Sequence, residues 1–172
     1  MKGSTDNVMD KQTFSEQVLA MGDSLYRVAR TILRSPADCE DAVQEAVAKA
    51  WEKRGTLREE RYFRTWLTRI VINECYALCR RQEDTVPLDS CTDLRAPTGE
   101  PVDTELRDAL MALPVKLRVA MVLYYVEGYS VGEIAGMTRV PAGTVKSRLS
   151  RGRKLLREAL SDTDQGGTVW IS

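Results

Sequence analysis

Apolar side chains recur every three or four residues along most of the chain, which is the spacing of one face of an α-helix. The first such stripe covers residues 14–32 and predicts a helix there. Ser35 and Pro36 then supply the cap and the first turn of a second helix, which the pattern extends over residues 36–53. A third stripe predicts a helix over residues 62–81, after a charged loop.

The second and third predicted helices define the expected core of this half of the chain. In the second helix the inward positions are Cys39, Ala42, Val43, Ala46, Val47, Ala50 and Trp51. In the third helix the apolar ridge consists of Phe63, Trp66, Leu67, Ile70, Ile72 and Leu78. The spacing of Phe63 and Trp66 favours a core position over contact with a ligand.

Residues 82–103 interrupt this periodicity. They contain three prolines and one glycine, and they carry six acidic side chains against one basic side chain, a net charge of −5. Such a composition is typical of a linker. Beyond it, the apolar pattern predicts short helices over residues 104–113 and 115–127, which end at Pro114 and Gly128.

Residues 129–157 form the most informative segment. Ser130 and Glu133 make a capping box for a short helix, and Pro141 begins a longer helix after a tight turn, reaching about Leu160. A short capped helix, a turn and a longer basic helix are the pattern of a helix-turn-helix, whose second helix enters the DNA major groove. The alternative is a basic surface helix packed on a bundle.

The two sides of this last helix differ in character. Its apolar side consists of Val145, Leu149, Gly152, Leu156 and Leu160. Its polar side consists of Lys146, Ser147, Ser150, Arg151 and Lys154. Side chains of these polar types contact both base edges and phosphates, and Arg148, Arg153 and Arg157 are placed to contact the flanking backbone.

Composition narrows the chemistry further. The chain carries 25 basic and 25 acidic residues and no histidine, so the commonest general base and metal ligand is absent. Among four cysteines, Cys75 and Cys79 share a helical face, but no second pair completes a zinc site, and a buried helical face is the favoured explanation. We expect no metal, no cofactor and no small-molecule substrate. Residues 1–20 lack an apolar run, so we expect no signal peptide or membrane insertion and a cytoplasmic location.

These patterns together predict an all-α protein with two small helical domains joined by a flexible acidic linker, the second being a helix-turn-helix domain. The predicted segments are a disordered N-terminus at 1–12, a first domain at 13–82, a linker at 83–103, a second domain at 104–161 and a flexible tail at 162–172.

The second domain carries motifs of a known family. The segments Glu133–Ala135 and Pro141–Arg153 resemble the C-terminal domain of the extracytoplasmic-function (ECF) group of bacterial sigma factors, which are promoter-recognition subunits of RNA polymerase. Leu113–Pro114 and Arg118 also fit that group. The resemblance implies that this domain is the sigma region 4 and contacts the −35 element as duplex.

The first domain resembles the same group independently. Asp41–Ala46, followed by Ala50–Trp51, is similar to its polymerase-binding helix. Phe63–Leu67, continuing through Asn73 to Arg80–Arg81, is similar to its promoter-melting helix. The resemblance implies that this domain is the sigma region 2, which binds core RNA polymerase and contacts the −10 element as a single strand.

The resemblance also implies roles for individual residues. For core polymerase, the matching residues, which we expect opposite the apolar stripe of their helix, are Asp41, Gln44, Glu45 and Lys49. For −10 DNA they are Arg58, Arg61, Tyr62, Arg69 and Asn73. For −35 DNA they are Thr144, Lys146, Ser147, Arg148, Ser150 and Arg151. Implied partners are core RNA polymerase, promoter DNA and an anti-sigma factor.

The sequence departs from the family pattern at three positions. Val47 stands where a phenylalanine is usual, Ala77 near a usual aspartate, and Gly152 where an alanine is usual. Two other functions compete with this interpretation. A stand-alone helix-turn-helix regulator would explain residues 129–157 alone, and an enzyme such as a nuclease would need a metal cluster or nucleophile motif that the sequence does not contain.

Overall fold

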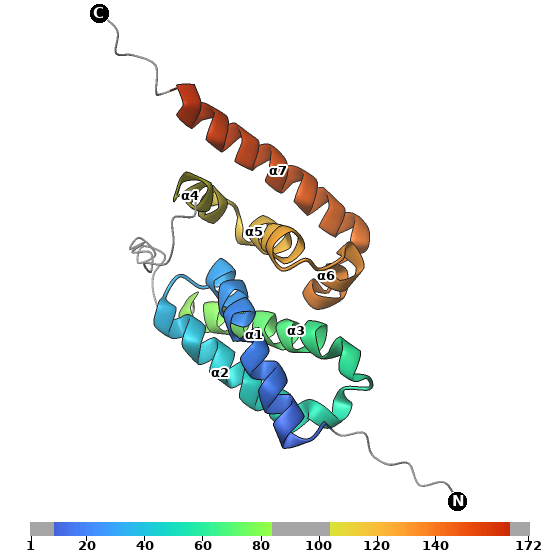
Figure 1. The fold of residues 1–172 in the computed structure, drawn as a ribbon. Coiled ribbons are helices and arrows are strands. Elements are labelled where there is room, and N and C mark those ends of the chain that lie inside the picture. The colour runs from blue at the N-terminus through green and yellow to red at the C-terminus, as the bar shows by residue number, and fades with distance from the viewer. Residues whose placement is uncertain (1–8, 84–103, 166–172) are drawn as a thin grey trace, which may run out of the picture. The chain divides into compact units, whose positions relative to one another are not determined.

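The computed structural model describes residues 9–83 and 104–165, and this part of the chain is helical without any strand. The expectation of an all-α protein is confirmed. The helices fall into two separate compact units, one containing α1 to α3 and the other containing α4 to α7 (Figure 1). Expectations about residues 1–8, 84–103 and 166–172, including Cys91, concern parts of the chain outside the described residues.

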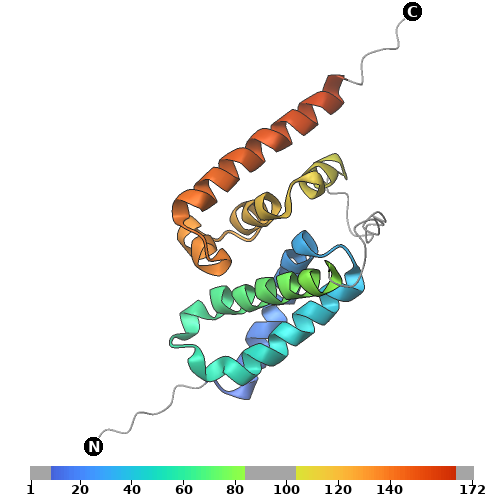
Figure 2. The same ribbon diagram turned by 180° about the vertical axis from the view of Figure 1, so that it is seen from behind.

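The first unit is a bundle of three helices, α1 (Lys11–Ile32), α2 (Pro36–Lys53) and α3 (Phe63–Glu83). Each of the three packs against the other two, and Figure 2 shows the unit from behind. Two 3-10 turns, η1 (Arg54–Thr56) and η2 (Glu60–Tyr62), lie where a charged loop is predicted between α2 and α3.

The first helix begins earlier than the sequence pattern indicates. Asp10 caps α1, and its carboxylate accepts hydrogen bonds from the backbone N–H groups of Gln12 and Thr13 at 2.9 and 3.0 Å. These bonds lower the pKa of the Asp10 carboxyl, the one from Thr13 most strongly. The prediction of a disordered segment reaching residue 12 is therefore wrong for Lys11 and Gln12, because the polar cap extends the helix beyond its apolar stripe.

Small side chains from α2 and a ladder of larger ones from α3 fill the core of the first unit. The buried α2 residues are Cys39, Ala42, Ala46 and Ala50. The buried apolar residues of α3 are Phe63, Leu67, Val71, Ile72 and Cys75. Val43, Val47, Trp51, Trp66, Ile70 and Leu78 are half-buried rather than fully inward. The prediction missed Val71, although the series 63, 67, 71 and 75 follows an uninterrupted spacing of four.

The second unit contains α4 (Thr104–Ala112), α5 (Val115–Met121), α6 (Val131–Thr138) and α7 (Ala142–Gln165). A single π-helical turn, η3 (Val122–Val126), continues α5. Figure 1 shows α4 and α5 alongside α7, with α6 at the N-terminal end of α7.

The last helix is longer than predicted. It ends at Gln165 rather than near Leu160, so the expected flexible tail from residue 162 is wrong for residues 162–165. The physical reason is local, because neither glycine nor proline occurs between Arg157 and the first glycine after it, Gly166. None of the helices in the described part of the chain has the length and apolar character needed to cross a membrane.

Candidate nucleic-acid and polymerase interfaces

The segment between α2 and α3 presents a stacked cation and ring to solvent. The Arg61 guanidinium lies over the Tyr62 ring at 4.8 Å from its centroid, and its Nε is 2.7 Å from the Glu59 carboxylate. Tyr62 is 50% exposed, although it is a large aromatic residue. Arg58 is exposed as well. Exposed arginines beside an accessible aromatic ring have the chemistry that holds unstacked bases and their phosphates.

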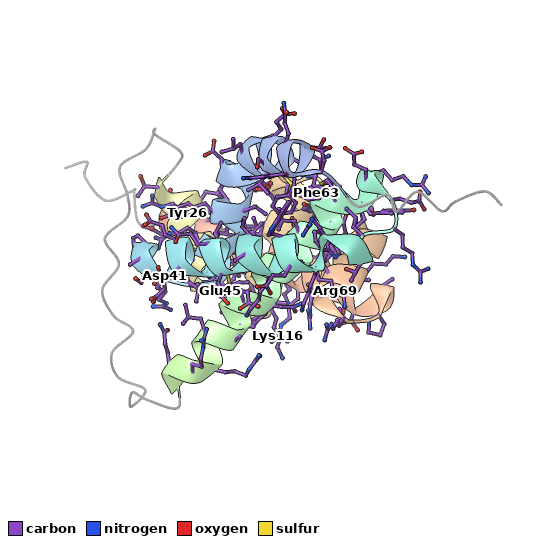
Figure 3. The ribbon with its side chains drawn as sticks, turned by 90° about the horizontal axis from the view of Figure 1, so that it is seen from below. Tyr26, Asp41, Glu45, Phe63, Arg69 and Lys116 are labelled. Atoms are coloured by element: carbon purple, nitrogen blue, oxygen red, sulfur yellow. The ribbon has the colours of Figure 1, made fainter. Side chains whose placement is uncertain are left out.

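Two further predicted DNA-contact residues lie on α3, which follows this loop. Arg69 is exposed and Asn73, one turn further on, is half-buried. Figure 3 labels Arg69 on α3, together with Phe63 at the start of the same helix. The structure thus places Arg58, Arg61 and Tyr62 in one short loop, and Arg69 and Asn73 together on the neighbouring helix.

An aromatic cluster supports the loop from within the first unit. The Phe14 ring contacts Trp51 and Phe63 at centroid distances of 5.2 and 5.6 Å, and Trp66 lies 5.9 Å from Phe63. Phe63 is fully buried, which confirms its predicted core position. Because Phe63 is the first residue of α3, this cluster fixes the point at which the loop joins the helix.

The exposed side of α2 carries carboxylates. Asp41, Gln44 and Glu45 are exposed, as predicted, and Figure 3 shows Asp41 and Glu45 on successive turns of α2. Lys49 differs from the prediction, because it lies at the seam between α2 and α3. Its Nζ is 2.7 Å from Glu74 and 3.3 Å from Glu45, and the bond to Glu74 is the main cause of a raised Lys49 pKa.

The ion pair between Lys49 and Glu74 could not be predicted from the sequence, because it depends on the packing of α2 against α3. Lys49 and Glu74 are 25 residues apart, and no local pattern links them. The ion pair is partly exposed, so its contribution to stability is small. Its main consequence is orientation, since it holds Lys49 beside α3 while Asp41 and Gln44 face solvent.

The second unit has the geometry of a helix-turn-helix. The backbone N–H of Glu133 donates to Ser130 Oγ at 3.2 Å, while the Ser130 N–H donates to Glu133 Oε2 at 2.8 Å, so the predicted capping box is present. At the other end of α6, Arg139 adopts a left-handed conformation with φ 54°. This conformation ends α6 and turns the chain toward Pro141 and α7.

The two sides of α7 divide as predicted in its first half. Val145, Leu149 and Gly152 are buried, whereas Leu156 and Leu160 are half-buried. Exposed side chains line the polar side, namely Lys146, Ser147, Ser150, Arg151 and Lys154. Thr144 and Arg148 are half-buried at its margins. An open hollow of about 620 Å³ follows this side and is lined in part by Ser147, Ser150 and Arg151.

Gly152 has a specific packing role. A Cβ atom at this position would lie 2.8 Å from Met121 Cγ and 2.9 Å from Met121 Sδ. These distances are shorter than van der Waals contact, so any side chain at residue 152 would force the Met121 side chain to move. The departure from the family's alanine therefore has a structural partner in Met121.

One exposed group in this unit was missed by sequence analysis. Tyr124, Tyr125 and Val126 in η3 are 39, 51 and 57% exposed, and the two tyrosine rings meet edge to face at 4.9 Å. Arg153 Nη1 donates to the Tyr125 hydroxyl at 2.9 Å. The apolar pattern predicts a regular helix over 115–127, whereas the π-helical turn changes the direction of these side chains.

The described cysteines of the first unit lie wholly or partly inside it. Cys39 and Cys75 are fully buried and Cys79 is half-buried. Burial raises the pKa of Cys75 to about 12 and also raises the pKa of Cys39. Thiols in such an environment are poor nucleophiles and poor metal ligands. Among the described residues no group of His, Cys, Asp and Glu is arranged to hold a metal ion.

Two helical units, one of them a helix-turn-helix with a basic exposed face, are typical of proteins that bind DNA in transcription. Comparison with known proteins identifies the family. The family model of Sigma-70 region 2 matches residues 18–85, and that of Sigma-70, region 4 matches residues 103–156.

Individual relatives agree with these matches. The ECF RNA polymerase sigma factor SigM of Mycobacterium tuberculosis is 35% identical over 164 residues, which cover 93% of this chain and 83% of SigM. SigW of Bacillus subtilis is 30% identical over 171 residues, covering 89% and 91% of the two chains. The sigma factor RpoE of Bartonella quintana, solved in complex with the anti-sigma factor NepR, superposes with a TM-score of 0.74 at 28% identity, covering 87% of this chain and 98% of RpoE.

The chain belongs to the ECF group of RNA polymerase sigma factors, the subunits that direct core polymerase to particular promoters. The resemblance that the sequence motifs suggested is confirmed. Both units match their respective sigma regions, which a stand-alone helix-turn-helix regulator would not explain.

Proposed function

We propose that the two units contact promoter DNA in two different forms, the second unit as duplex at −35 and the first as an opened strand at −10. The observation that carries this proposal is the exposed polar side of α7. The capped α6 and the turn at the left-handed Arg139 precede α7 and complete the helix-turn-helix. In this proposal, residues 104–161 act as region 4 and residues 13–82 as region 2, joined by the acidic segment 83–103.

At −35, the contacts are proposed to come from the first half of α7. The residues concerned are Thr144, Lys146, Ser147, Arg148, Ser150 and Arg151. Arg151 and Lys146 are exposed and carry the donors that pair with guanine edges and phosphates. Thr144 and Arg148, being half-buried, are better placed for the flanking sugar-phosphate backbone.

At −10, the contacts are proposed to come from the loop and the adjoining helix. The residues concerned are Arg58, Arg61, Tyr62, Arg69 and Asn73. The exposed Arg61–Tyr62 stack supplies a surface for an unstacked base, and Arg58 and Arg69 supply positive charge for its phosphates. Asn73 carries an amide that can pair with a base edge.

Core polymerase is proposed to bind the exposed side of α2 through Asp41, Gln44 and Glu45, with Lys49 held beside them by Glu74. Polymerase performs the chemistry, and this chain acts as a non-enzymatic subunit in the cytoplasm. Tethering both DNA contacts to one enzyme raises the effective concentration of the second contact. An anti-sigma factor is the proposed inhibitory partner, as for the structurally similar RpoE bound to NepR.

The proposal is tested with purified core RNA polymerase. Gel filtration measures association, and run-off transcription over fragmented genomic DNA, followed by alignment of start sites, identifies the promoters used. We expect co-elution and a defined set of start sites. A chain that elutes separately, or that gives the core enzyme no start-site preference, would contradict the proposed function.

Substitutions then separate the two DNA contacts. Arg151→Ala should weaken the −35 footprint by about 1–3 kcal/mol if a bidentate base contact is lost. Asn73→Ala should reduce transcription from promoters with the native −10 sequence and leave core binding intact. Lys116→Ala, which removes an exposed cation from α5, is the matched control for charge. An unchanged footprint for Arg151→Ala would remove that assignment.

A further inference from the structure

The loop proposed to contact single-stranded DNA contains two carboxylates, which require an explanation. Residues 58–61 have the sequence Arg-Glu-Glu-Arg. A carboxylate facing a phosphate weakens binding, so acidic residues are not expected at such a surface without another role. Glu59 is engaged by Arg61 at 2.7 Å. Glu60 is engaged by a residue from a different helix.

Gln17 of α1 reaches this loop across the fold. Its Nε2 donates to Glu60 Oε1 at 2.5 Å, although the two residues are 43 positions apart in the sequence. Gln17 is half-buried on α1, one turn after Phe14 of the aromatic cluster. The contact therefore joins the loop to a rigid part of the bundle.

Glu60 also borders a small hollow next to the end of α2. Glu60, Arg54, Leu57 and Met9 line this hollow, whose volume is about 20 Å³. Arg54 is itself held in place, because its guanidinium lies 3.7 Å from the Trp51 ring centroid and its Nη1 donates to the Trp51 carbonyl at 2.8 Å. A cation held by Trp51 and the Glu60 carboxylate thus line the same hollow.

We propose that Glu60 and Gln17 form an anchor that positions the loop for capture of the opened promoter strand, with Glu60 acting as a positioning residue rather than a DNA contact. This inference rests on the proposed function of the first unit at −10. The Glu60 hydrogen bond to Gln17 joins η2 to α1, while the next two residues, Arg61 and Tyr62, remain stacked and exposed.

The physical reason for an anchor is preorganisation. A single strand has no fixed shape, so the protein must hold the loop in its binding conformation before the strand arrives. If the loop occupies that conformation for only a fraction of the time, apparent affinity falls by the same fraction. We expect loss of the anchor to weaken capture of the −10 strand roughly fivefold to tenfold, since one exposed, charge-assisted hydrogen bond is lost.

The test exchanges donor and acceptor across the pair. Gln17→Glu places two carboxylates against each other and should release the loop. Glu60→Gln leaves two amides that can still bond, so its effect should be smaller. The double variant Gln17→Glu with Glu60→Gln restores one amide and one carboxylate with their positions exchanged, and it should recover most of the lost binding.

The chain offers a matched control on the same helix. Gln12 Nε2 donates to Glu16 Oε1 at 3.0 Å, which is a bond of the same chemistry that does not involve the loop. Gln12→Glu should therefore introduce the same kind of repulsion and the same charge without changing strand capture. Thermal unfolding of every variant should remain close to wild type, because both hydrogen bonds lie at the surface.

The measurements use complete holoenzyme on a promoter identified by the transcription experiment. Permanganate reactivity of unpaired thymines reports opening, and affinity for a fork template with a single-stranded −10 segment reports capture. Core association and the −35 footprint should not change in any variant.

Three results would overturn the inference while leaving the proposed function intact. Gln17→Glu could open promoters as well as wild type does, Gln12→Glu could be equally impaired, or the double variant could fail to recover. The last result would mean that Glu60 itself contacts DNA or polymerase. Failure of the wild-type holoenzyme to open any promoter would instead contradict the proposed function, so the two failures are distinguishable.

Discussion

The two units hold their candidate DNA-contact residues in opposite ways. In the second unit these residues lie on consecutive turns of one helix, and features local in the sequence position that helix, namely the Ser130–Glu133 capping box and the left-handed Arg139. In the first unit the residues lie largely in a loop, and a side chain from a distant part of the sequence, Gln17, bonds to it through Glu60.

The difference follows from the form of DNA that each unit is proposed to contact. The major groove of a duplex has fixed dimensions, which a regular helix fits without adjustment. An opened strand has no such dimensions, so its shape must come from the protein surface, and a loop supplies more varied positions for side chains. To position DNA-contact residues, a helix requires a fixed start and direction, whereas a loop requires contacts that hold it at several points.

The largest effect is expected from the buried arginine of the second unit. Arg118 is only 2% exposed, and its Nη1 donates to the backbone carbonyls of Met111 and Leu113 at the end of α4. Arg118→Met would leave these carbonyls without that donor and should lower the free energy of unfolding by about 3 kcal/mol. Lys116→Met, an exposed change on the same helix, is the control and should cost less than about 0.5 kcal/mol.

Hydrogen exchange tests whether the two units are stabilised separately. Amides of α7 should lose protection in Arg118→Met, while amides of α3 in the first unit should keep it. Equal loss in both helices would show that the two units are energetically coupled and would contradict their separate stabilisation.

A smaller effect, with a change of sign, is expected at Gly152. In the wild-type background Gly152→Ala should destabilise the second unit by about 1–2 kcal/mol, because the clash with Met121 exceeds the gain in helix propensity. In a Met121→Ala background the same substitution should stabilise it by up to about 1 kcal/mol. A urea-unfolding double-mutant cycle measures the coupling, and equal effects in both backgrounds would rule out this packing explanation.

Removal of the helix cap should have a comparable or slightly smaller effect. Ser130→Ala deletes the acceptor of the Glu133 N–H and should cost about 1 kcal/mol. Ser161→Ala, near the end of α7, is the control. Because α6 positions α7, the −35 footprint should weaken while affinity for a fork template with a single-stranded −10 segment stays at the wild-type level. Equal losses in both assays would contradict the prediction that the cap affects only the second unit.

The smallest effect concerns Cys75 in the first unit. Its pKa is raised from 9.0 to about 12 by burial, so the folded state favours the neutral thiol. That preference is fully present below pH 9 and is lost as the pH rises from 9 toward 12. The difference in unfolding free energy between wild type and Cys75→Ala should therefore stay constant from about pH 6 to pH 8 and shrink above pH 9. A difference that changes with pH between 6 and 8 would show that the thiol is not buried as described.

Much of the fold could be predicted from sequence because its signals are local. Helix periodicity, the Ser35 and Ser130 caps and the breaks near Gly55 and Pro114 depend on residues within one or two turns of each other. The inward positions of Val145 and Leu149 were predicted for the same reason. The motifs of the ECF group also lie in contiguous segments, so they indicate the family without a tertiary structure.

Tertiary structure alone decided how particular side chains are used. Lys49 meets Glu74 and Gln17 meets Glu60 across distances of 25 and 43 residues, which no local pattern encodes. Likewise, the contact between Gly152 and Met121 depends on how closely two helices approach. Which helices form and which of their faces are apolar follows from the order of residues, because these features depend on backbone hydrogen bonding and local spacing. The anchoring of the loop was determined by packing, because it depends on which surfaces the completed bundle brings together.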